Sequence, residues 1–252
     1  MKKIKYILMF TVVLLYSCQK MDYAENVSQV VVDGVFLPQE VPVIILNSLG
    51  DIDGVNQVPV TDARVAVYSD DKLYNFSLAE GNQGAYIYSG NDLEIIAGKN
   101  YQLEINYKGN VLFAEATIPY PVKDVELNVL TDRQDTLAGY IDVSWNSSDN
   151  SYFYTTLGCD SLLSGNDCSY FCSPNFPFSE CNLFLDTKEL VEGNYYKLTI
   201  YSMTEEYAQY CYGSPDYGYT GNIENGYGIF TGINLKSISF QYLTDSVSVV
   251  NE

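Results

Sequence analysis

Residues 101–107 read Tyr-Gln-Leu-Glu-Ile-Asn-Tyr, and this heptapeptide sets the fold class of the chain. Large and polar side chains alternate along it, so every second side chain lies on the same face of an extended strand. One face then holds Tyr101, Leu103, Ile105 and Tyr107, and the other holds Gln102, Glu104 and Asn106. The alternation predicts a strand that turns one face to a core and the other to solvent.

A second strand follows directly. Lys108-Gly109-Asn110 predicts a tight turn, and residues 111–118, Val-Leu-Phe-Ala-Glu-Ala-Thr-Ile, predict the returning strand of a hairpin. Pro119 and Pro121 end this sheet, because proline has no backbone N–H to donate to a ladder. We therefore expect a boundary between two domains at Pro119.

The remaining strand signals lie on both sides of this boundary. They are β-branched or alternating runs at residues 30–32, 42–46, 64–68, 140–145 and 195–201. Trp145 falls on the apolar face of its run, which predicts a place in a core. Ser202-Met-Thr-Glu205 has the spacing of a capping box and predicts a helix of about two turns at residues 204–210. We expect an all-β chain of two β-sandwiches, over residues 29–119 and 120–252, with one short helix.

Each half resembles a known type of sandwich. Residues 61–67 (Thr-Asp-Ala-Arg-Val-Ala-Val), 84–86 (Gly-Ala-Tyr) and 97–103 (Ala-Gly-Lys-Asn-Tyr-Gln-Leu) resemble the transthyretin-like or carboxypeptidase-regulatory-like fold. Residues 140–145, Tyr-Ile-Asp-Val-Ser-Trp, resemble an early strand of a fibronectin type III-like domain. The first resemblance implies a folded spacer or a docking module without protease chemistry.

The first eighteen residues, 1–18, read as a bacterial lipoprotein signal peptide. Lysines at the start precede an apolar run of eleven residues, 6–16, which fits a signal peptide and falls short of the roughly 20 residues that span a bilayer. The run ends in Leu15-Tyr16-Ser17-Cys18, which resembles a lipobox, whose cysteine receives the lipid. We expect lipidation of Cys18 and a tether over residues 19–28. An ordinary secretory signal is the alternative, but Tyr16 does not suit its small-residue cleavage site.

The chain is strongly acidic. The signal peptide carries three of the 13 Lys and Arg and none of the 32 Asp and Glu, so the mature chain keeps 10 basic and 32 acidic side chains and a net charge of −22. Nucleic acid and anionic membrane surfaces bind basic patches, so neither is expected as an electrostatic partner. The lipid then has to provide the membrane attachment. A soluble, self-repelling surface accounts for most of the acidity.

Five cysteines remain after Cys18. They are Cys159, Cys168, Cys172, Cys181 and Cys211. Four of them lie in an insert at residues 159–181, which is typical of a loop stapled by disulfides in an exported protein. The odd number leaves one thiol over, or one bridge to another chain, and the spacing does not choose among the pairings. A zinc site is disfavoured, because the chain has no histidine and lacks two close Cys pairs.

The motifs do not assemble a catalytic centre. The absence of histidine excludes Ser–His and Cys–His nucleophilic pairs. Glu205 and Glu206 lie in the first turn of the expected helix, where acids favour the helix dipole. Asp51-Ile-Asp53-Gly54 begins like a calcium loop, but the later ligands do not follow. We expect no enzyme activity, no metal and no cofactor.

Tyrosine is the residue in excess, because nine of the 24 tyrosines lie between residues 195 and 227. Tyrosine joins rigid contact area to a polar tip, which suits recognition of peptides, glycans or proteins. The candidate binding face consists of Tyr207, Tyr210, Tyr212, Tyr217 and Tyr219. Packing is the equal alternative, because tyrosine is also common in strands.

Three segments resemble a Bacteroidota O-glycosylation pattern, in which an Asp precedes Ser or Thr and an aliphatic residue follows. They place candidate glycosylation at Thr136, Ser161 and Ser246. Such a short motif also arises by chance, and an intact-mass measurement on the native protein tests it.

The chain as a whole resembles a family of Bacteroidota outer-membrane lipoproteins catalogued as a domain of unknown function. Residues 31–35 (Val-Val-Asp-Gly-Val), 199–207 (Thr-Ile-Tyr-Ser-Met-Thr-Glu-Glu-Tyr) and 222–230 (Asn-Ile-Glu-Asn-Gly-Tyr-Gly-Ile-Phe) carry the resemblance. It implies an outer-membrane location and a TonB-dependent transporter as partner, since the family's genes tend to lie beside such transporters. Gln19-Lys20-Met21-Asp22 resembles the signal that exports lipoproteins to the cell exterior.

We therefore expect a lipid-anchored accessory or ligand-capture subunit of a TonB-dependent transporter. The alternative is a structural or adhesive surface protein that binds glycan or host protein without a transporter. A carboxylate hydrolase ranks last, because it needs two acids held about 5–10 Å apart and no spacing in the sequence argues for such a pair.

Overall fold

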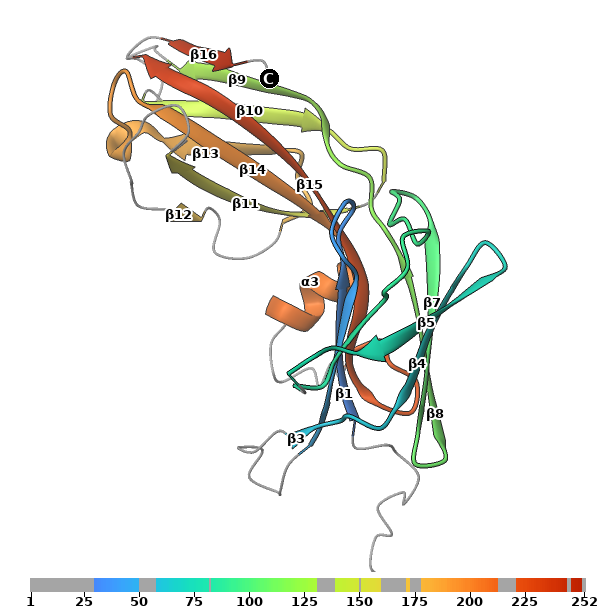
Figure 1. Ribbon diagram of the computed structural model, residues 1–252. Coiled ribbons are helices and arrows are strands. Elements are labelled where there is room, and N and C mark those ends of the chain that lie inside the picture. The colour runs from blue at the N-terminus through green and yellow to red at the C-terminus, as the bar shows by residue number, and fades with distance from the viewer. Residues whose placement is uncertain are drawn as a thin grey trace, which may run out of the picture.

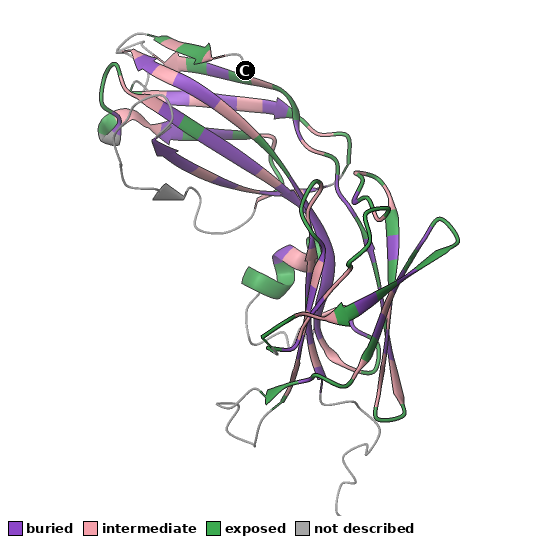
Figure 2. Ribbon diagram, in the orientation of Figure 1, coloured by how far each residue is buried: buried purple, intermediate pink, exposed green. Residues whose placement is uncertain are grey.

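The computed structural model describes residues 30–49, 58–81, 83–130, 139–149, 151–159, 171–172, 178–212, 221–243 and 246–250. Strands dominate these residues, and α3 (Glu205–Tyr212) is the single α-helix among them. The expected all-β class with one short helix is confirmed. Along strands such as β1 and β7, buried residues alternate with exposed or half-buried ones (Figure 2).

The first half of the described chain is a β-sandwich around one core. One layer has the strand order β15-β1-β2-β6 and the other β5-β4-β7-β8, and pairing of β5 with β6 joins them. The strands are β1 (Val30–Phe36), β2 (Val43–Ser48), β3 (Val58–Pro59, paired with β2), β4 (Arg64–Ser69), β5 (Lys72–Leu78), β6 (Ala85–Ile87), β7 (Asn100–Tyr107) and β8 (Asn110–Thr117). Phe36 lies at the centre of the core, with edge-to-face contacts to Tyr101 and Phe230.

The β7–β8 hairpin forms as the alternation predicts. Tyr101, Leu103 and Ile105 are buried, while Gln102 is exposed. The turn residues Lys108 and Gly109 have φ angles of 48° and 83°, and two central residues with positive φ are what the tightest hairpin turn requires.

The second half forms another sandwich. A three-stranded sheet, β13-β10-β9, packs on a layer of order β12-β11-β14-β15, with β16 on the other side of β15. The elements are β9 (Lys123–Leu130), β10 (Tyr140–Asn146), β11 (Tyr152–Cys159), β12 (Phe171–Cys172), β13 (Asn182–Asp186), the 3-10 turn Thr187–Glu189, β14 (Tyr195–Met203), β15 (Tyr227–Leu243) and β16 (Ser246–Val250). Trp145 is 4% exposed and packs edge-to-face on Phe153, so its predicted place in the core is confirmed.

Strand β15 runs through both sandwiches (Figure 1). Residues 227–232 pair in parallel with β1, and residues 233–241 pair antiparallel with β14. Ile223 and Phe230 therefore pack in the first core, although both come long after the expected domain boundary at Pro119 in the sequence. The proposed limits of the two domains stay a prediction, and a shared strand joins the two cores.

The short helix lies against the concave side of the bend between the sandwiches (Figure 1). It begins one residue later than expected, and its cap is Thr204, whose Oγ1 accepts a hydrogen bond from the backbone N–H of Tyr207 at 3.3 Å. The predicted capping box from Ser202 is wrong. Ser202 is fully buried in β14, which continues to Met203, and its hydroxyl has no hydrogen-bond partner among the described residues, so it does not cap the helix.

Candidate ligand-binding site

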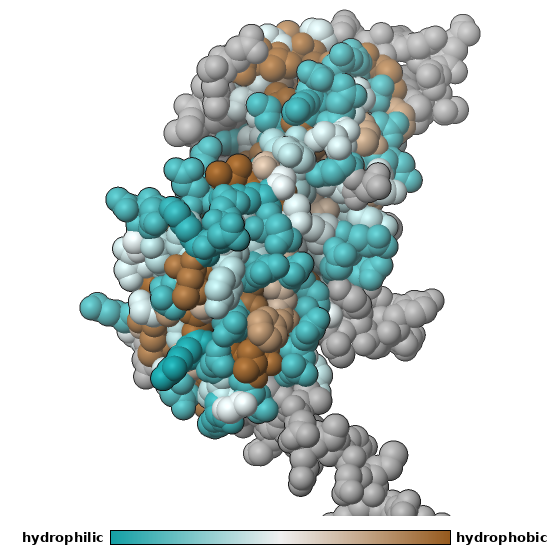
Figure 3. Space-filling model, turned by 90° about the vertical axis from the view of Figure 1, so that its right-hand side faces the viewer, coloured by the Kyte–Doolittle hydropathy of each residue, from teal (hydrophilic) through white to brown (hydrophobic). Residues whose placement is uncertain are grey.

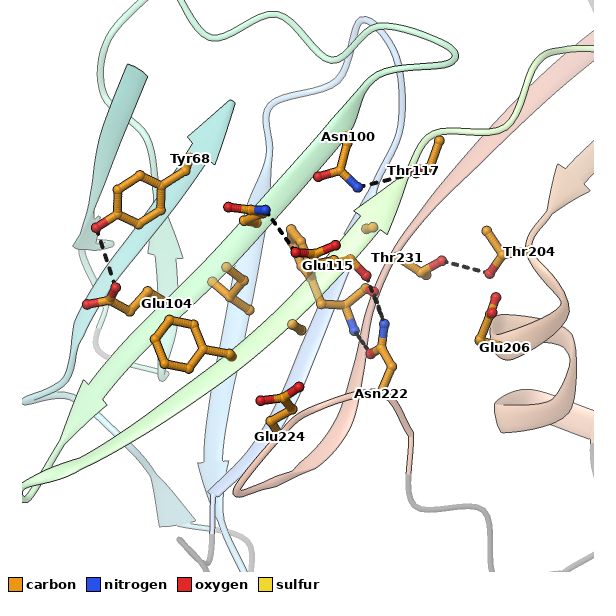
Figure 4. Close-up of a pocket in the computed structure, with 16 residues that line it drawn as sticks. Tyr68, Asn100, Glu104, Glu115, Thr117, Thr204, Glu206, Asn222, Glu224 and Thr231 are labelled. Carbon is orange, nitrogen blue, oxygen red and sulfur yellow. Dashed lines mark hydrogen bonds between the residues drawn. The ribbon is translucent and has the colours of Figure 1, made fainter. Parts of the chain in front are cut away.

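A groove of about 850 Å³ crosses the outer face of β7 and β8. Tyr68 and Glu104 lie at one end of it, and Thr204 and Glu206, at the start of α3, lie at the other (Figure 4). Figure 3 looks onto this side of the molecule, where hydrophobic atoms are interspersed among hydrophilic ones. The groove therefore joins the outer face of one sheet to the N-terminus of the helix.

The alternation of β7 and β8 puts the groove's side chains on the outer face. Leu112, Ala114 and Ala116 point inward, so Phe113, Glu115 and Thr117 point outward with the even-numbered residues of β7. Two aromatic rings are left in solvent, because Phe113 is 44% exposed and Tyr68 is 36% exposed. A large ring on the polar face of a strand contributes nothing to the core.

Two groove carboxylates are held in place by neighbouring side chains. Glu104 accepts hydrogen bonds from the Tyr68 hydroxyl at 3.4 Å and from Asn106 Nδ2 at 2.7 Å. Glu115 Oε1 accepts one from Gln102 Nε2 at 2.8 Å. These contacts fix where the negative charge lies on the sheet face.

The loop of residues 221–226 forms one wall of the groove. The Asn222 side chain accepts from the Phe230 N–H at 2.9 Å and donates to the Phe230 carbonyl at 2.7 Å and to the Glu115 carbonyl at 3.2 Å. Glu224 pairs with Phe113 through two backbone hydrogen bonds, of 2.8 and 3.3 Å. The loop is thereby fixed to the edge of β8, with the Glu224 side chain at the rim.

The helix supplies the opposite wall. Thr204 Oγ1 lies 3.2 Å from Thr231 Oγ1, which ties the helix start to β15. Glu205 accepts a hydrogen bond from Gln209 along the helix, whereas Glu206 lines the groove. The two adjacent acids of the sequence thus have different surroundings.

The chemistry of the groove is acidic and aromatic. Its lining includes Glu104, Glu115, Glu206 and Glu224 and contains neither Lys nor Arg. Across the described parts of the chain, no group of three or more Cys, Asp or Glu is placed to hold a metal ion. The arrangement can bind through hydrogen bonds, charge attraction and contact with exposed rings.

The predicted tyrosine face divides in the structure. Tyr207 is half-buried and packs with Met203, Ala208 and Ile233, while Tyr210 and Tyr212 are 37% and 45% exposed. Burial, followed by a hydrogen bond with the Cys211 thiol, raises the pKa of Tyr207. Tyr217 and Tyr219 lie outside the described residues. Of the described tyrosines in this face, Tyr207 therefore packs, and Tyr210 and Tyr212 are exposed.

The cysteines differ from the expected arrangement of one leftover thiol. Cys181 and Cys211 are both free. Cys181 packs against the second core, whereas Cys211 lies on α3, where burial raises the pKa of its thiol. Cys159 is buried at the end of β11 and Cys172 lies in β12, which pairs with β11. Cys168 lies outside the described residues.

Other candidate residues fall mostly outside the described part of the chain. These are Cys18, the Asp51–Gly54 segment, Thr136 and Ser161. Ser246 is exposed at the first position of β16. Among the described residues, no helix is long and apolar enough to cross a membrane.

The groove was not among the sites expected from the sequence. One available signal was Phe113, an aromatic residue on the polar face of a predicted strand. The contributions of Asn222 and Glu206 had no local signal, because they meet β8 only through the folding of β15 and α3.

Most of the chain matches a known family model. The family model described as "Domain of unknown function (DUF4249)" matches residues 19–239. No curated protein matches. Among solved structures, a cytokine receptor complex is similar with a TM-score of 0.34 and 11% identity, over 87% of this chain and 95% of that chain. The FN1–FN3 domains of chicken CNTN1 are similar with a TM-score of 0.35 and 16% identity, over 70% of this chain and 59% of that chain.

Proposed function

The chain belongs to the family described as a domain of unknown function (DUF4249), and from that premise we propose that it is a ligand-binding protein of the cell envelope. Its binding site is the groove across β7 and β8. The single observation that carries the proposal is the composition of this groove, where two exposed rings and four carboxylates face about 850 Å³ of open space. Rings and charged groups that converge on one concavity are typical of recognition sites.

The proposed role is binding without catalysis. Glu104 and Glu115 already accept hydrogen bonds from Tyr68, Asn106 and Gln102, which suits a fixed charge better than a proton donor. A nucleophile with an adjacent base is the usual sign of hydrolytic chemistry, and the groove's lining contains no Cys, Ser or Lys to serve as one. Its threonine hydroxyls pair with each other, as Thr204 and Thr231 do, or with the Asn100 amide, as Thr117 does.

The groove is tested by replacing its exposed ring. Phe113→Ala should abolish capture of the native ligand while leaving the melting temperature within about 2 °C, since an exposed ring adds little to stability. Phe184→Ala is the matched control, because Phe184 is 41% exposed on the second sandwich. Retained capture in Phe113→Ala would remove the groove as the site.

The proposed attachment is a lipid on Cys18, in the outer membrane and facing the cell exterior. The direction of β1 supports this attachment. β1 runs parallel to β15 and begins at the end of the first sandwich that is remote from the second sandwich. An anchor that precedes β1 would place the first sandwich nearest the membrane and the second farther out. Radiolabelled palmitate should enter the protein and be absent from Cys18→Ala; an unlabelled protein in the soluble fraction would exclude the anchor.

The proposed partner is a TonB-dependent transporter, with this chain as its accessory or capture subunit. The family resemblance of the sequence supports this partner, and the acidic groove supports the capture role. Crosslinking of whole cells followed by affinity purification should recover a β-barrel transporter. Recovery of the lipoprotein without such a transporter would favour the second candidate.

The second candidate is an adhesive surface protein that binds glycan or host protein without a transporter. The exposed rings of Tyr210 and Tyr212 on α3 favour it, because exposed tyrosines are enriched at recognition surfaces. Loss of cell adhesion in a Tyr210→Ala, Tyr212→Ala double variant, with capture through the groove intact, would support this candidate.

We also propose one disulfide among Cys159, Cys168 and Cys172. The pairing of β11 with β12 brings the chain segments of Cys159 and Cys172 close together, which supports the proposal. Peptide mapping under non-reducing conditions should recover one crosslinked pair from these three. The same spectra test glycosylation at Thr136, Ser161 and Ser246.

A further inference from the structure

We infer that the first sandwich contacts the surface of the lipid bilayer through the end at which β1 begins, which we call the entry end. This inference rests on the proposed lipid anchor at Cys18 and adds the orientation of the anchored protein. Three features argue for it: exposed aliphatic side chains, a tyrosine–lysine pair, and the short stretch of chain between the anchor and β1.

Three parts of the chain meet at the entry end. Ser48 of β2 pairs with Val30, the first residue of β1, and also with Val58 of β3. The β7–β8 turn lies at the same end, because Asn225 donates a hydrogen bond to the Val111 carbonyl at 3.1 Å and β15, which begins just after Asn225, pairs with the start of β1. In Figure 1 this end is at the bottom, away from the second sandwich. It is therefore the end nearest to an anchor that precedes β1.

Two large aliphatic side chains are exposed at the entry end. Val58 is 56% exposed, and Leu49, which is 38% exposed, directly follows the residue that pairs with Val58. Neither side chain packs in one of the hydrophobic cores. Neighbouring aliphatic side chains in water are a mark of a protein or membrane contact, because their transfer to an apolar medium is favourable.

A tyrosine–lysine pair lies at the same end. The Lys108 ammonium is 4.7 Å from the centroid of the Tyr107 ring, at the turn between β7 and β8. Tyrosine is enriched where a bilayer meets water, and a lysine there can extend its ammonium to the lipid phosphates. Arg64, exposed at the start of β4, pairs with Asn106 beside this turn. These two cations offset Asp62, whose charge acts on Lys108.

The chain between the anchor and β1 is short. Eleven residues, 19–29, separate Cys18 from Val30, and a fully extended chain of this length spans about 40 Å at most. A flexible chain of the same length spans about 20 Å on average. The entry end therefore stays close to the bilayer, and the high local concentration makes a weak attraction sufficient for contact.

The test is quenching of tryptophan fluorescence by lipid. The full-length lipidated protein is reconstituted into phosphatidylcholine vesicles with and without brominated phosphatidylcholine. It carries either Val58→Trp, at the entry end, or Val41→Trp, at the turn from β1 to β2 on the opposite end, where Val41 is 66% exposed. Trp145 is the one native tryptophan and is 4% exposed in the second core, so it adds a constant background.

We expect the brominated lipid to quench the added emission of Val58→Trp by about a third or more, because a tryptophan at the bilayer interface meets the acyl chains. The emission of Val41→Trp and of the parent protein should not change. Equal quenching of the two variants would overturn the inference.

A further variant separates the contact from the affinity of tryptophan itself for a bilayer. Leu49→Asp, added to Val58→Trp, should lower the quenching about two-fold or more, because a carboxylate resists leaving water. The melting temperature should not change, since Leu49 packs in no core. Val41→Asp, added to Val58→Trp, is the control and should leave the quenching as it is. No effect of Leu49→Asp would also overturn the inference.

The anchor and the contact fail in different ways. If the Val58→Trp protein does not float with the vesicles, the proposed lipid anchor is wrong, and the inference fails with it. If the protein floats but its Val58→Trp emission is not quenched, the anchor stands and the contact at the entry end is wrong.

Discussion

Gly228 stands where a side chain would meet the carbonyl oxygen of Val32, at the start of the parallel pairing of β1 and β15. Its φ angle is +99°, a conformation that costs other residues about 1–2 kcal/mol. We predict that Gly228→Ala lowers the free energy of unfolding by more than this strain alone, because the backbones would have to separate. Urea unfolding measures the loss.

Gly193 provides the control for this prediction. Its φ angle is +84°, but a Cβ there would meet no atom within 4 Å. Gly193→Ala should therefore show the backbone strain without the clash. Equal losses in the two variants would mean that β1 and β15 are not packed as described.

The tyrosines of α3 differ in how far they are buried, so they should differ in their contribution to stability. Tyr207→Ala should cost about 1–3 kcal/mol of stability, because its ring packs on Met203 and Ile233. Tyr210→Ala, at a ring that is 37% exposed, should cost less than half as much. Thermal unfolding of the two variants measures this difference, and the reverse order would contradict the placement of the helix.

Tyr207 also predicts a dependence of stability on pH. Burial raises its pKa in the folded protein above the value of about 10 expected in the unfolded chain, so its contribution is complete below pH 10 and is lost as the pH rises through the folded pKa. The urea midpoint should therefore stay level from pH 8.5 to pH 10 and fall between pH 10 and pH 11. The urea midpoint of Tyr207→Phe should fall less over the same interval. An equal fall would exclude the Tyr207 hydroxyl as the cause.

Strands β7 and β8 were predictable because only one face of each is buried. Apolar and polar residues therefore alternate along both strands, and the turn residues Lys108 and Gly109 mark where the chain reverses. Strand β15 was not identified, because residues 228–234 are all buried and leave no alternation to detect. That burial arises from its position in both sandwiches, which local sequence does not encode.

The loop of residues 221–226 is the element that closes part of the β8 edge. Asn222 connects this loop to both β8 and β15 through three hydrogen bonds. We predict that Asn222→Ala costs about 1–3 kcal/mol, because it leaves backbone groups of Phe230 without partners. Asn182→Ala, at an exposed position on β13, should be nearly neutral in the same urea titration.

The outcome for Asn222→Ala also bears on binding. A loss of stability as small as that of Asn182→Ala would mean that the loop is not fixed to the strand edge. Glu224 would then not keep its place in the lining of the groove.

The candidate site was harder to predict than the fold. Phe113 and Glu115 are adjacent on one predicted strand face, so the outer side of the sheet could be found from the sequence. Their grouping with Glu206 and Glu224 requires α3 and the 221–226 loop to reach β8 in space. Long-range packing of this kind leaves no periodic trace in the chain.

Taken as a whole, the molecule is two sandwiches joined by one strand, with its groove on the sandwich that contains β1. Because β15 pairs with strands of both sandwiches, its pairing fixes how the two sandwiches are placed relative to each other. An anchor before β1 would hold the groove on the membrane side of the molecule. A ligand captured there would be close to any transporter in the same membrane.

The measurement that tests the groove most directly is site-specific photocrosslinking in living cells. A photoreactive amino acid replaces Phe113 in one strain and Phe184 in another, at residues that are 44% and 41% exposed. We predict a ligand adduct from position 113 and none from position 184. Adducts of equal yield at both positions, or none at position 113, would contradict the assignment of the groove as the ligand-binding site.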